Sequence, residues 1–591
     1  MKHILFISNK NRQIAYMKRM AGHEALAGRI TVSARRYTGD PVFDEEWTEA
    51  LASADIVLVT HMGTGLDTRF MQKMAKWLQK HHHRYLMLVE EKSMDGLLEG
   101  ITLEEAHQVS LYLAHSGEEN YVNLMNYLAA LDGDGDPGKV TPPKSHPWCG
   151  IVGRRGEVYA SCEEYEKEYR FDKEEPCLGK VGVLFYRDEW IANELHYPFA
   201  LFDTLRRNHL EPVLFFSPYM RNEERNQPSL KDSLDQLFGK DQLPLDALID
   251  TCKFSFLSMK AMTLETLKSY DVPVFQAYVM YQSGEEWESS IEGLTPVEVS
   301  LSVGLPEMDG SLHGGVIASQ ETIDEESVYL PIEERVEAVV SRVRNWVLLR
   351  KKPNKDKRVA IIFHNYPPSN SNVGSAVGLD SPESVRLLLE AMKDEGYAVD
   401  HVPDDSQNLM EEVLAHATND RKFLTAAAAR LAEGHLEVDA YKEFFSSLTE
   451  KAKKHIVEDW GEPIGDVFVY DNELLIPGFS NGNVWIGVQP PRGFSDDPNK
   501  LYHDPVSAPT HHYEGFYHWL REVWKADAVI HVGTHGNLEW LPGKGTGLSA
   551  SCYPEMAIQD LPNIYPYWTT IVGEGIQAKR RGAACLVGHL T

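Results

Sequence analysis

Short apolar runs alternate with stretches of helical periodicity from the first residues of the chain. Lys2–Ser8, Ile56–Thr60 and Tyr85–Val89 are each long enough for a buried strand. Between the last two runs, Asp67–Lys80 repeats apolar residues at helical spacing. The repeating positions are Phe70, Met71, Met74, Trp77 and Leu78. Strands that alternate with helices predict parallel pairing, with helices on both faces of the sheet.

The same alternation starts again twice. The second series opens with a strand at Lys180–Tyr186 and a helix near residues 191–208, followed by strands at Pro212–Phe216, Ala247–Ile249 and Val272–Gln276. The third opens with Arg358–Phe363 and a loop over Asn365–Gly378, then a helix with Ser381 as N-cap, Pro382 at its first position and Glu383 in its first turn. Two long helices at Leu409–Glu433 and Asp439–Glu458 precede strands at Val467–Tyr470, Val484–Val488 and Ala528–Val532.

Two polar stretches separate these series. Leu131–Trp148 is rich in Gly, Pro and Asp and has no periodicity, and Leu349–Arg358 is a basic run that contains proline. We therefore expect an N-terminal α/β domain over residues 1–150, a second α/β domain over 180–350 and a third over 356–591. The predicted fold class is α/β, with several flavodoxin-like parallel-sheet layers in a large multidomain chain.

Composition narrows the class of protein. The chain of 591 residues has 58 Lys and Arg against 88 Asp and Glu, a formal net charge of −30, which disfavours nucleic acid and anionic membranes as partners. It contains no apolar run of about 18 residues that would span a bilayer. Its six cysteines form no C-x-x-C pair, which argues against a thiolate zinc site and a disulfide framework and fits a reducing cytoplasm. We expect a cytoplasmic enzyme or enzyme subunit.

Histidine is concentrated in one stretch, Gln489–Gly547. Its central part reads ADAVIHVGTHGNLEWLPGKGTGLS, in which His531 ends a predicted strand, His535 lies in the following turn, and Glu539 comes four residues later. Ligands of open α/β sheets bind at that edge. Imidazoles with a carboxylate suit a divalent transition metal, and the same groups can take protons from a substrate. On chemistry alone, structural and ligand roles for these histidines are equally supported, and the H-E-x-x-H motif of zinc peptidases is absent.

Glycines and basic residues follow this stretch. LPGKGTG does not match a phosphate-binding Walker A loop, because Lys544 is followed by Gly545 and the position of the first glycine is Leu538. Lys544 is instead available to an acidic substituent of a flat ligand. Lys579, Arg580 and Arg581 can recognise carboxylates. An ordinary helix surface paired with nearby acids explains that cluster equally well.

From about Lys180 to the last residue, the chain resembles the large subunit of cobaltochelatase and the related magnesium chelatase subunit. The resemblance is dense from Val484 onward, through VWIGVQPPRGFSDDPNK, THHYEGFYHWLREVWKADAVIHVGTHGNLEWLPGKGTGLS and LPNIYPYWTTIVGEGIQAKRRG. Earlier segments such as KVGVLFYRDEWIANE and NYPPSNSNVGSAVGLDSPESV agree with it. In relatives this stretch continues for several hundred residues, so the unit over 356–591 is expected to be incomplete at its C-terminal end.

The resemblance implies insertion of a metal into a tetrapyrrole in cobalamin biosynthesis. Co(II) would enter a corrinoid precursor such as hydrogenobyrinic acid a,c-diamide, with Mg-ATP hydrolysed on a separate AAA+ ATPase subunit that works with an integrin-like (von Willebrand A) subunit. We expect His535 and Glu539 to be catalytic. The expected metal ligands are His531, His535 and Glu539, with His511 and His512 as second choices. Arg492, Lys544 and Arg580 are expected to hold side chains of the macrocycle.

Three alternatives remain open at this point. EWLPGKGTGLS, YPYW and the histidine-rich site favour cobalt over magnesium, because Mg²⁺ prefers oxygen ligands. A magnesium chelatase subunit that acts on protoporphyrin IX is the first alternative, and a tetrapyrrole-binding protein without chelatase activity is the second. A metal-dependent hydrolase built on the His/Glu cluster is the third, and the resemblance along the chain argues against it.

Overall fold

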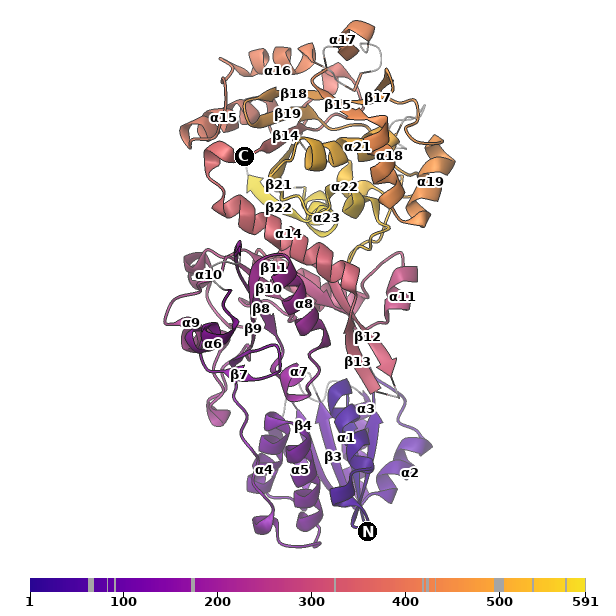
Figure 1. The fold of residues 1–591 in the computed structure, drawn as a ribbon. Helices are drawn as coiled ribbons and strands as arrows, with labels where there is room; N and C mark the ends of the chain where they lie inside the picture. Colours follow the sequence, from indigo (N-terminus) through magenta and orange to yellow (C-terminus); the bar gives the residue numbers. More distant parts are fainter. Residues whose placement is uncertain are drawn as a thin grey trace.

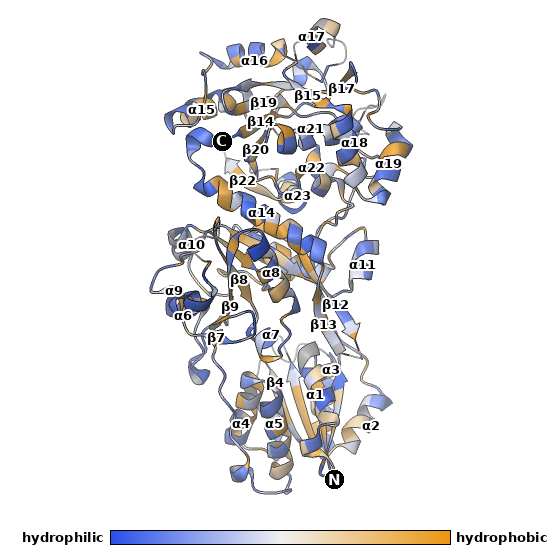
Figure 2. Cartoon of the chain, in the orientation of Figure 1, coloured by the Kyte–Doolittle hydropathy of each residue, from blue (hydrophilic) through white to orange (hydrophobic). Residues whose placement is uncertain are grey.

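The computed structural model shows three α/β units in succession along an elongated molecule, with the N-terminus at one end (Figure 1). It describes residues 1–61, 69–81, 83–89, 92–171, 176–323, 326–416, 419–420, 425–430, 432–493, 504–533, 536–568 and 571–589. Hydrophobic residues gather on the strands, and the outer faces of the helices are mainly hydrophilic (Figure 2). No helix within the described ranges has the length and hydropathy needed to cross a membrane.

The first unit contains the three strands predicted there. Its strands are β1 (Lys2–Ser8), β2 (Ile30–Arg36), β3 (Ile56–His61), β4 (Arg84–Val89) and β5 (Lys92–Glu99). They lie in the order β2-β1-β3-β4-β5, parallel except for β5. The packed helices are α1 (Asn11–Ala21), α2 (Glu45–Ser53), α3 (Arg69–His81), α4 (Leu103–His115) and α5 (Glu118–Leu131). The predicted helix at Asp67–Lys80 is α3, and its first two residues lie outside the described ranges.

The second unit begins earlier in the chain than the predicted boundary at residue 180. Its strands are β6 (Gly150–Val152), β7 (Val158–Tyr159), β8 (Gly179–Phe185), β9 (Leu210–Phe216), β10 (Ala247–Asp250), β11 (Val274–Val279), β12 (Leu312–Ile323) and β13 (Glu326–Pro331). The order is β13-β12-β11-β10-β8-β9-β6-β7. β6 pairs antiparallel with β9, so residues 150–159 extend this sheet. The predicted helix at residues 191–208 is α8 (His196–Arg207), and a shorter helix, α7 (Arg187–Ile191), ends at the residue where it was predicted to begin.

The third unit carries the histidine-rich stretch. The strands of its main sheet are β14 (Val359–Phe363), β18 (Gly478–Asn481), β19 (Val484–Val488), β20 (Ala528–Val532), β21 (Asn563–Trp568) and β22 (Ala584–His589). They lie in the order β18-β19-β14-β20-β21-β22. A smaller sheet contains β15 (Gly434–Glu437), β16 (Val469–Tyr470) and β17 (Glu473–Ile476).

The three main sheets share one strand order. In the second sheet it runs β9-β8-β10-β11-β12, and in the third β19-β14-β20-β21-β22. Counted along the chain within each sheet, both read 2-1-3-4-5, as does the first sheet with its antiparallel fifth strand. This is the flavodoxin order, in which ligands bind at the switch point between the first and third strands. The predicted fold class is confirmed.

Helix boundaries in the third unit differ from the prediction. The predicted helix over Leu409–Glu433 is broken into α16 (Ser406–Ala415) and α17 (Ala426–Arg430), and the one over Asp439–Glu458 into α18 (Val438–Ser447) and α19 (Glu450–Trp460). The hydroxyl of Thr449 caps α19 and accepts from Ala452 N, so the second break has a local cause. Asp380, rather than Ser381, caps α15 (Ser381–Asp394) through a bond from Glu383 N.

One helix, α14 (Glu333–Lys351), joins the second unit to the third (Figure 1). Arg335 and Arg342 are seven residues apart and therefore share a helix face. Both donate to the carboxylate of Glu555 in the third unit, at 2.9 and 3.0 Å. Both arginines are buried, so this contact fixes one unit against the other.

Candidate functional site

Three neighbouring strands of the third sheet end in polar residues or glycine at its carboxyl edge. His364 follows β14, Gln489 follows β19, and Gly533 follows β20 after His531 and Val532. β14 lies between the other two, with Phe363 opposite both Val488 and Val532. These residues meet at the switch point of the sheet, around a narrow hollow. The hollow is lined by Ile362, His364, Gln489, His531, Val532, Gly533, Gly536 and Tyr565.

Gly533 allows the two central strands to end close together. A Cβ atom at this position would lie 2.4 Å from the Cβ of His364, which no side chain could accept. The backbone N–H of His364 donates to the carbonyl of Val532 at 2.9 Å and fixes the approach. The chain therefore leaves β20 at Gly533 in close contact with the chain that leaves β14 at His364. Ligands of this fold bind at this place.

Glu539 is a buried carboxyl group at this edge. It lies in the short turn Leu538–Trp540 and is 2% exposed. Its Oε1 accepts the backbone N–H of Gly536 at 2.9 Å and lies 3.5 Å from the hydroxyl of Tyr565. Burial raises the pKa of Glu539 to about 7. The group can therefore take up and release a proton near neutral pH, as a general base must.

His531 is held in a chain of hydrogen bonds. Gln489 Nε2 donates to the Tyr517 hydroxyl at 2.8 Å, which lies 2.9 Å from His531 Nε2. His531 Nδ1 lies 2.8 Å from Asn563 Oδ1, an acceptor, so Nδ1 carries the proton and Nε2 accepts from Tyr517. Burial lowers the pKa of His531 to about 4 and keeps the ring neutral. A metal ion could use Nε2 only if Tyr517 released it.

The structure places His531 and Glu539 next to the same residue, Tyr565, but places His511 and His512 elsewhere. Both of the latter belong to α21 (His511–His518). His511 bonds to the Tyr441 hydroxyl at 2.8 Å and the Gly461 carbonyl at 2.9 Å, and His512 bonds to the Leu475 carbonyl at 2.7 Å. These partners belong to the packing of α21, not to the sheet edge. His535 lies outside the described residues, and the described part of the chain contains no group of three or more His, Cys, Asp or Glu able to hold a metal ion.

Two of the three predicted ligand-binding cations donate to backbone carbonyls. Arg492 is 1% exposed and donates to Trp540 O at 2.9 Å, Asp504 O at 2.6 Å and Ser507 O at 3.1 Å. Lys544 donates through Nζ to the carbonyls of residues 287, 288 and 290 at 2.7, 2.9 and 2.7 Å. Those carbonyls lie at the end of α11 (Gly284–Ser289) in the second unit. Both cations hold backbone segments in place through these bonds. Their direct contact with a ligand stays a prediction.

The third cation, Arg580, forms an ion pair between units. It lies on α23 (Val572–Gly582) and donates from Nε and one terminal nitrogen to Glu307 of the second unit, at 2.8 and 2.7 Å. Although burial alone would raise it, hydrogen bonds from Arg580 and His313 lower the pKa of Glu307 to about 2. The neighbouring Arg581 donates to the carbonyls of residues 539, 541 and 544, at 2.6 to 3.0 Å. The basic cluster thus holds the Glu539 loop and the unit interface.

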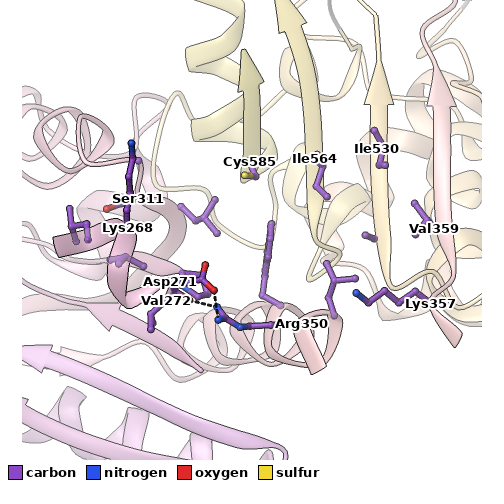
Figure 3. Close-up of a pocket in the computed structure, with 18 of the residues that line it drawn as sticks. Lys268, Asp271, Val272, Ser311, Arg350, Lys357, Val359, Ile530, Ile564 and Cys585 are labelled. Carbon is purple, nitrogen blue, oxygen red and sulfur yellow. Dashed lines mark hydrogen bonds and ion pairs between the residues drawn. The ribbon is translucent and has the colours of Figure 1, made fainter. Parts of the chain in front are cut away.

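A much larger cavity lies at the opposite, amino edge of the same sheet. It has a volume of about 750 Å³ and opens between the second and third units. Figure 3 shows Val359, Ile530 and Ile564 on the neighbouring strands β14, β20 and β21, facing Val272 and the ion pair of Arg350 with Asp271. Its walls are mainly apolar. The cavity can hold a ring-sized molecule, but Glu539 and His531 do not line it.

Residues 110–591 match the family model described as CobN/Magnesium Chelatase. The chain belongs to this family. An uncharacterized protein of Methanocaldococcus jannaschii, MJ0908, is 38% identical over 563 residues, which cover 92% of this chain and 45% of that protein. The aerobic cobaltochelatase subunit CobN of Pseudomonas aeruginosa is 35% identical over 417 residues, 69% of this chain and 32% of that one.

A solved structure of the family has the same fold along the whole chain. The catalytic subunit of cobaltochelatase from Mycobacterium tuberculosis matches with a TM-score of 0.68 and 28% identity, over 100% of this chain and 48% of that one. The chain therefore spans less than half the length of the relatives that it matches. The predicted resemblance to the CobN and magnesium chelatase subunits is confirmed.

Several residues of the site in this CobN/magnesium chelatase family member were not predicted from sequence. Gln489, Tyr517, Asn563 and Tyr565 order the groups around His531 and Glu539. Gln489 had a usable signal, because it directly follows a buried strand whose carboxyl end faces the site. Tyr517 lies on a helix and Asn563 begins a strand, and nothing in their local sequence distinguishes them from core residues.

Proposed function

We propose that this chain carries the metal-insertion site of a chelatase large subunit. In the proposal it binds a tetrapyrrole and helps to insert Co(II), as substrate, into a corrinoid precursor such as hydrogenobyrinic acid a,c-diamide. The observation that carries the proposal is Glu539, a buried carboxyl with its pKa raised to about 7 at the switch point of the third sheet. Membership of the CobN/magnesium chelatase family supports the reaction class.

Glu539 has the properties that the proton step of metal insertion needs. A divalent ion that enters the ring displaces protons from the ring nitrogens, one from a corrin and two from a porphyrin, so the nitrogens bind the ion while these protons leave. A carboxylate with a pKa near 7 accepts a proton at neutral pH and returns it to solvent before the next transfer. The backbone N–H of Gly536 and the Tyr565 hydroxyl orient the carboxylate for this role.

The proposed ligands of the incoming ion are His531, His535 and Glu539. Imidazole nitrogens with one carboxylate suit Co(II), whereas Mg²⁺ prefers oxygen ligands. His535 shares the proposed catalytic role with Glu539 because of its place in the sequence, between His531 and Glu539. His511 and His512 are weaker candidates, since their bonding partners lie in the packing of α21 and not at the sheet edge, whereas His531 would have to release Tyr517 to bind the ion. In the proposal, three cations hold the macrocycle once they have released their present hydrogen-bond partners: Arg492, Lys544 and Arg580.

The proposed reaction needs further subunits. In the proposal, Mg-ATP is hydrolysed on an AAA+ ATPase subunit that acts with an integrin-like subunit, in the cytoplasm. The family description covers magnesium chelatases as well, so a magnesium chelatase H-type subunit acting on protoporphyrin IX is the second candidate. Binding without insertion would identify a tetrapyrrole-binding protein instead.

The experiment follows insertion through the visible absorption of the ring. The chain is mixed with hydrogenobyrinic acid a,c-diamide, Co(II), Mg-ATP and the partner subunits. We expect Glu539→Gln to leave ring affinity within about three-fold and to slow insertion by at least about 100-fold, the usual contribution of a general base. Insertion by the unmodified chain should rise with pH through about 7, as Glu539 loses its proton, and the variant should lack this dependence.

Glu395→Gln is the matched control, because Glu395 is exposed at the end of α15 and makes the same change of charge. Loss of ring binding in Glu539→Gln would place this residue in the ring pocket instead of the proton step. Insertion at the unmodified rate in that variant would contradict the proposal. Preference for protoporphyrin IX and Mg²⁺ would select the second candidate.

A further inference from the structure

A small cavity between the second and third units shares no lining residue with the hollow at the carboxyl edge. Its volume is about 20 Å³, and a cavity needs at least about 10–15 Å³ of such space to hold one water molecule, so a single particle of that size fits. Its lining includes four arginines, which come from the two helices α14 and α23: Arg335, Arg342, Arg580 and Arg581.

The two arginines of α14 share one buried carboxylate. Glu555 of the third unit accepts from Arg335 at 2.9 Å and from Arg342 at 3.0 Å, and it is the one carboxylate among the described residues that line the cavity. Glu334 also bonds to Arg335, at 2.6 Å, but its side chain is 55% exposed, so water screens its charge. On this side, two guanidinium charges therefore face one buried negative charge.

The two arginines of α23 add to this excess of positive charge. Arg580 pairs with Glu307, but Arg581 donates to backbone carbonyls and has no carboxylate partner in the part of the chain that the structure describes. Burial lowers the pKa of Arg581, as expected for a cation removed from water without a counter-charge. Burial also lowers the pKa of His313, which lines the cavity and supplies no negative charge. Four guanidinium groups are thus balanced by only two largely buried carboxylates.

The excess of positive charge and the size of the cavity define the ligand chemistry. Uncompensated buried charge is costly, and an anion between the guanidinium groups would compensate it. One terminal nitrogen of Arg335 and one of Arg580 have no hydrogen-bond partner among the described residues, so both can donate to such an anion. Phosphate, sulfate and carboxylates each carry several heavy atoms and are too large for this cavity, whereas chloride is only slightly larger than water.

We propose that this cavity binds one chloride ion, surrounded by Arg335, Arg342 and Arg580, and that the ion strengthens the contact between the second and third units. Since α14 and α23 both line the cavity, an anion inside it attracts cations of both helices and opposes their separation. The inference goes beyond the proposed function and depends on neither the metal nor the ring.

Two measurements on the full chain test the inference, with gluconate replacing chloride at constant ionic strength. The first is the extra width that the protein gives to the chloride NMR signal, which should follow saturable binding to one class of site. The second is the melting temperature, which should rise by about 1–3 °C when chloride exceeds its dissociation constant about ten-fold, because the ion binds only the folded chain. Constant ionic strength separates this effect from the screening of charges by salt.

Arg335→Gln removes one cation and one donor from the cavity, while Arg342 still holds Glu555. It should weaken chloride binding by at least about ten-fold, as expected for a hydrogen bond to a charged group. Arg350→Gln is the matched control, because Arg350 lies on the same helix and undergoes the same change of charge, but pairs with Asp271 near the surface. It should leave the affinity for chloride within two-fold.

Ala338→Val tests the cavity without a change of charge. Ala338 lines the cavity from α14, between the two arginines of that helix, and two added methyl groups should fill the space. We expect the chloride-dependent rise in melting temperature to disappear in this variant. Ala50→Val is the control, because Ala50 is half-buried on α2 in the first unit, far along the chain from the cavity.

The outcomes decide between an ion site and a water-filled cavity. The absence of saturable chloride binding would mean that the cavity holds only water, and the inference would be wrong. Unchanged binding in both Arg335→Gln and Ala338→Val would place the ion elsewhere and overturn the assignment, as would displacement of chloride by an equal concentration of sulfate. These measurements contain no ring and no Co(II), so a negative result leaves the proposed function unaffected.

Discussion

The two edges of the third sheet differ in almost every respect. The amino edge has an open cavity of about 750 Å³ with mainly apolar walls. The carboxyl edge has only a narrow hollow, but the neutral ring of His531 lines it, and Glu539, with its raised pKa, contacts the lining residues Gly536 and Tyr565. Strands of five residues at about 3.3 Å each separate the edges by roughly 16 Å. One ligand group cannot reach both.

The larger cavity and the reactive side chains therefore lie at different edges of the sheet. The two edges differ because they are formed in different ways. The amino-edge cavity lies where the second and third units meet without filling the space between them (Figure 3). Two of its charged lining residues, Arg350 and Asp271, pair with each other near the surface. The carboxyl edge collects polar groups because all parallel strands end there. We expect the reaction to take place at the polar carboxyl edge. We expect the apolar cavity at the amino edge to take no part in it.

The largest effect should come from removing the arginine that supports the carboxyl edge. Arg581→Met leaves three buried carbonyls, of residues 539, 541 and 544, without their donor, which should cost at least about 3 kcal/mol of stability. Because the charge of Arg581 also lowers the pKa of Glu539, its loss should raise that pKa further. Chemical denaturation and the pH profile of insertion measure the two effects.

Arg350→Met at the amino edge is the control for this change. Its partner Asp271 is largely exposed, and such surface pairs contribute less than about 1 kcal/mol. If both arginine variants lost equal stability, the proposed difference between the carboxyl edge, which Arg581 holds in place, and the amino edge would be wrong.

An intermediate effect concerns a second buried carboxyl in the third unit. Glu514 on α21 is fully buried, and within the described residues neither of its oxygens has a hydrogen-bond partner. Burial raises its pKa to about 8, so the folded state holds a proton that the unfolded state releases above about pH 4.5. Stability should therefore fall as pH rises through 6.5 to 8, by at most about 1.4 kcal/mol per pH unit for this group.

Glu514→Gln should make that decline shallower, measured as melting temperature against pH, while Glu539, with its pKa raised to about 7, still contributes to the lower part of it. The buried histidines do not affect stability between pH 6.5 and 8. The pKa values of His512 and His531 are lowered to about 4, so these residues reduce the stability of the folded protein only as pH falls below about 6.5. The insertion profile should stay unchanged, since Glu514 lies in the packing of α21. A shifted insertion profile would assign the proton step to Glu514 instead of Glu539.

The smallest effect is expected from filling the amino-edge cavity. Leu267→Trp places a large side chain into it, and we expect ring affinity within two-fold of the unmodified chain and unchanged insertion. Leu103→Trp, at an exposed position of α4, is the control for an added tryptophan. Loss of ring binding in Leu267→Trp alone would place the macrocycle in the large cavity and reverse the comparison of the two edges.

Sequence patterns predicted the sheets well because buried parallel strands are continuous apolar runs. β1, β19 and β20 have the predicted bounds, and β14 differs by a single residue. The break between α18 and α19 escaped prediction because apolar spacing continues across Thr449. Glu539 and His531 were predicted as neighbours from their place after a strand, and the structure brings both to Tyr565.

The functions of the basic residues could not be predicted in this way. Lys544 follows Glu539 by five residues and Arg580 follows it by 41, but their partners are the end of α11 for Lys544 and Glu307 for Arg580, each more than 250 residues earlier than the cation. Such partners are known only once the second unit is placed against the third. A cation that contacts a ligand and a cation that supports the backbone around the site look alike in the local sequence. Only their long-range contacts distinguish them.

The loop that carries Glu539 is fastened at both ends. Arg581 holds its carbonyls from one side, and Lys544, at its far end, is anchored to α11 of the second unit. With α14 also bridging the units through Glu555, the position of this loop depends on how the second unit is seated against the third. We therefore expect the proton affinity of Glu539 to be a property of the two packed units together and not of the third unit alone.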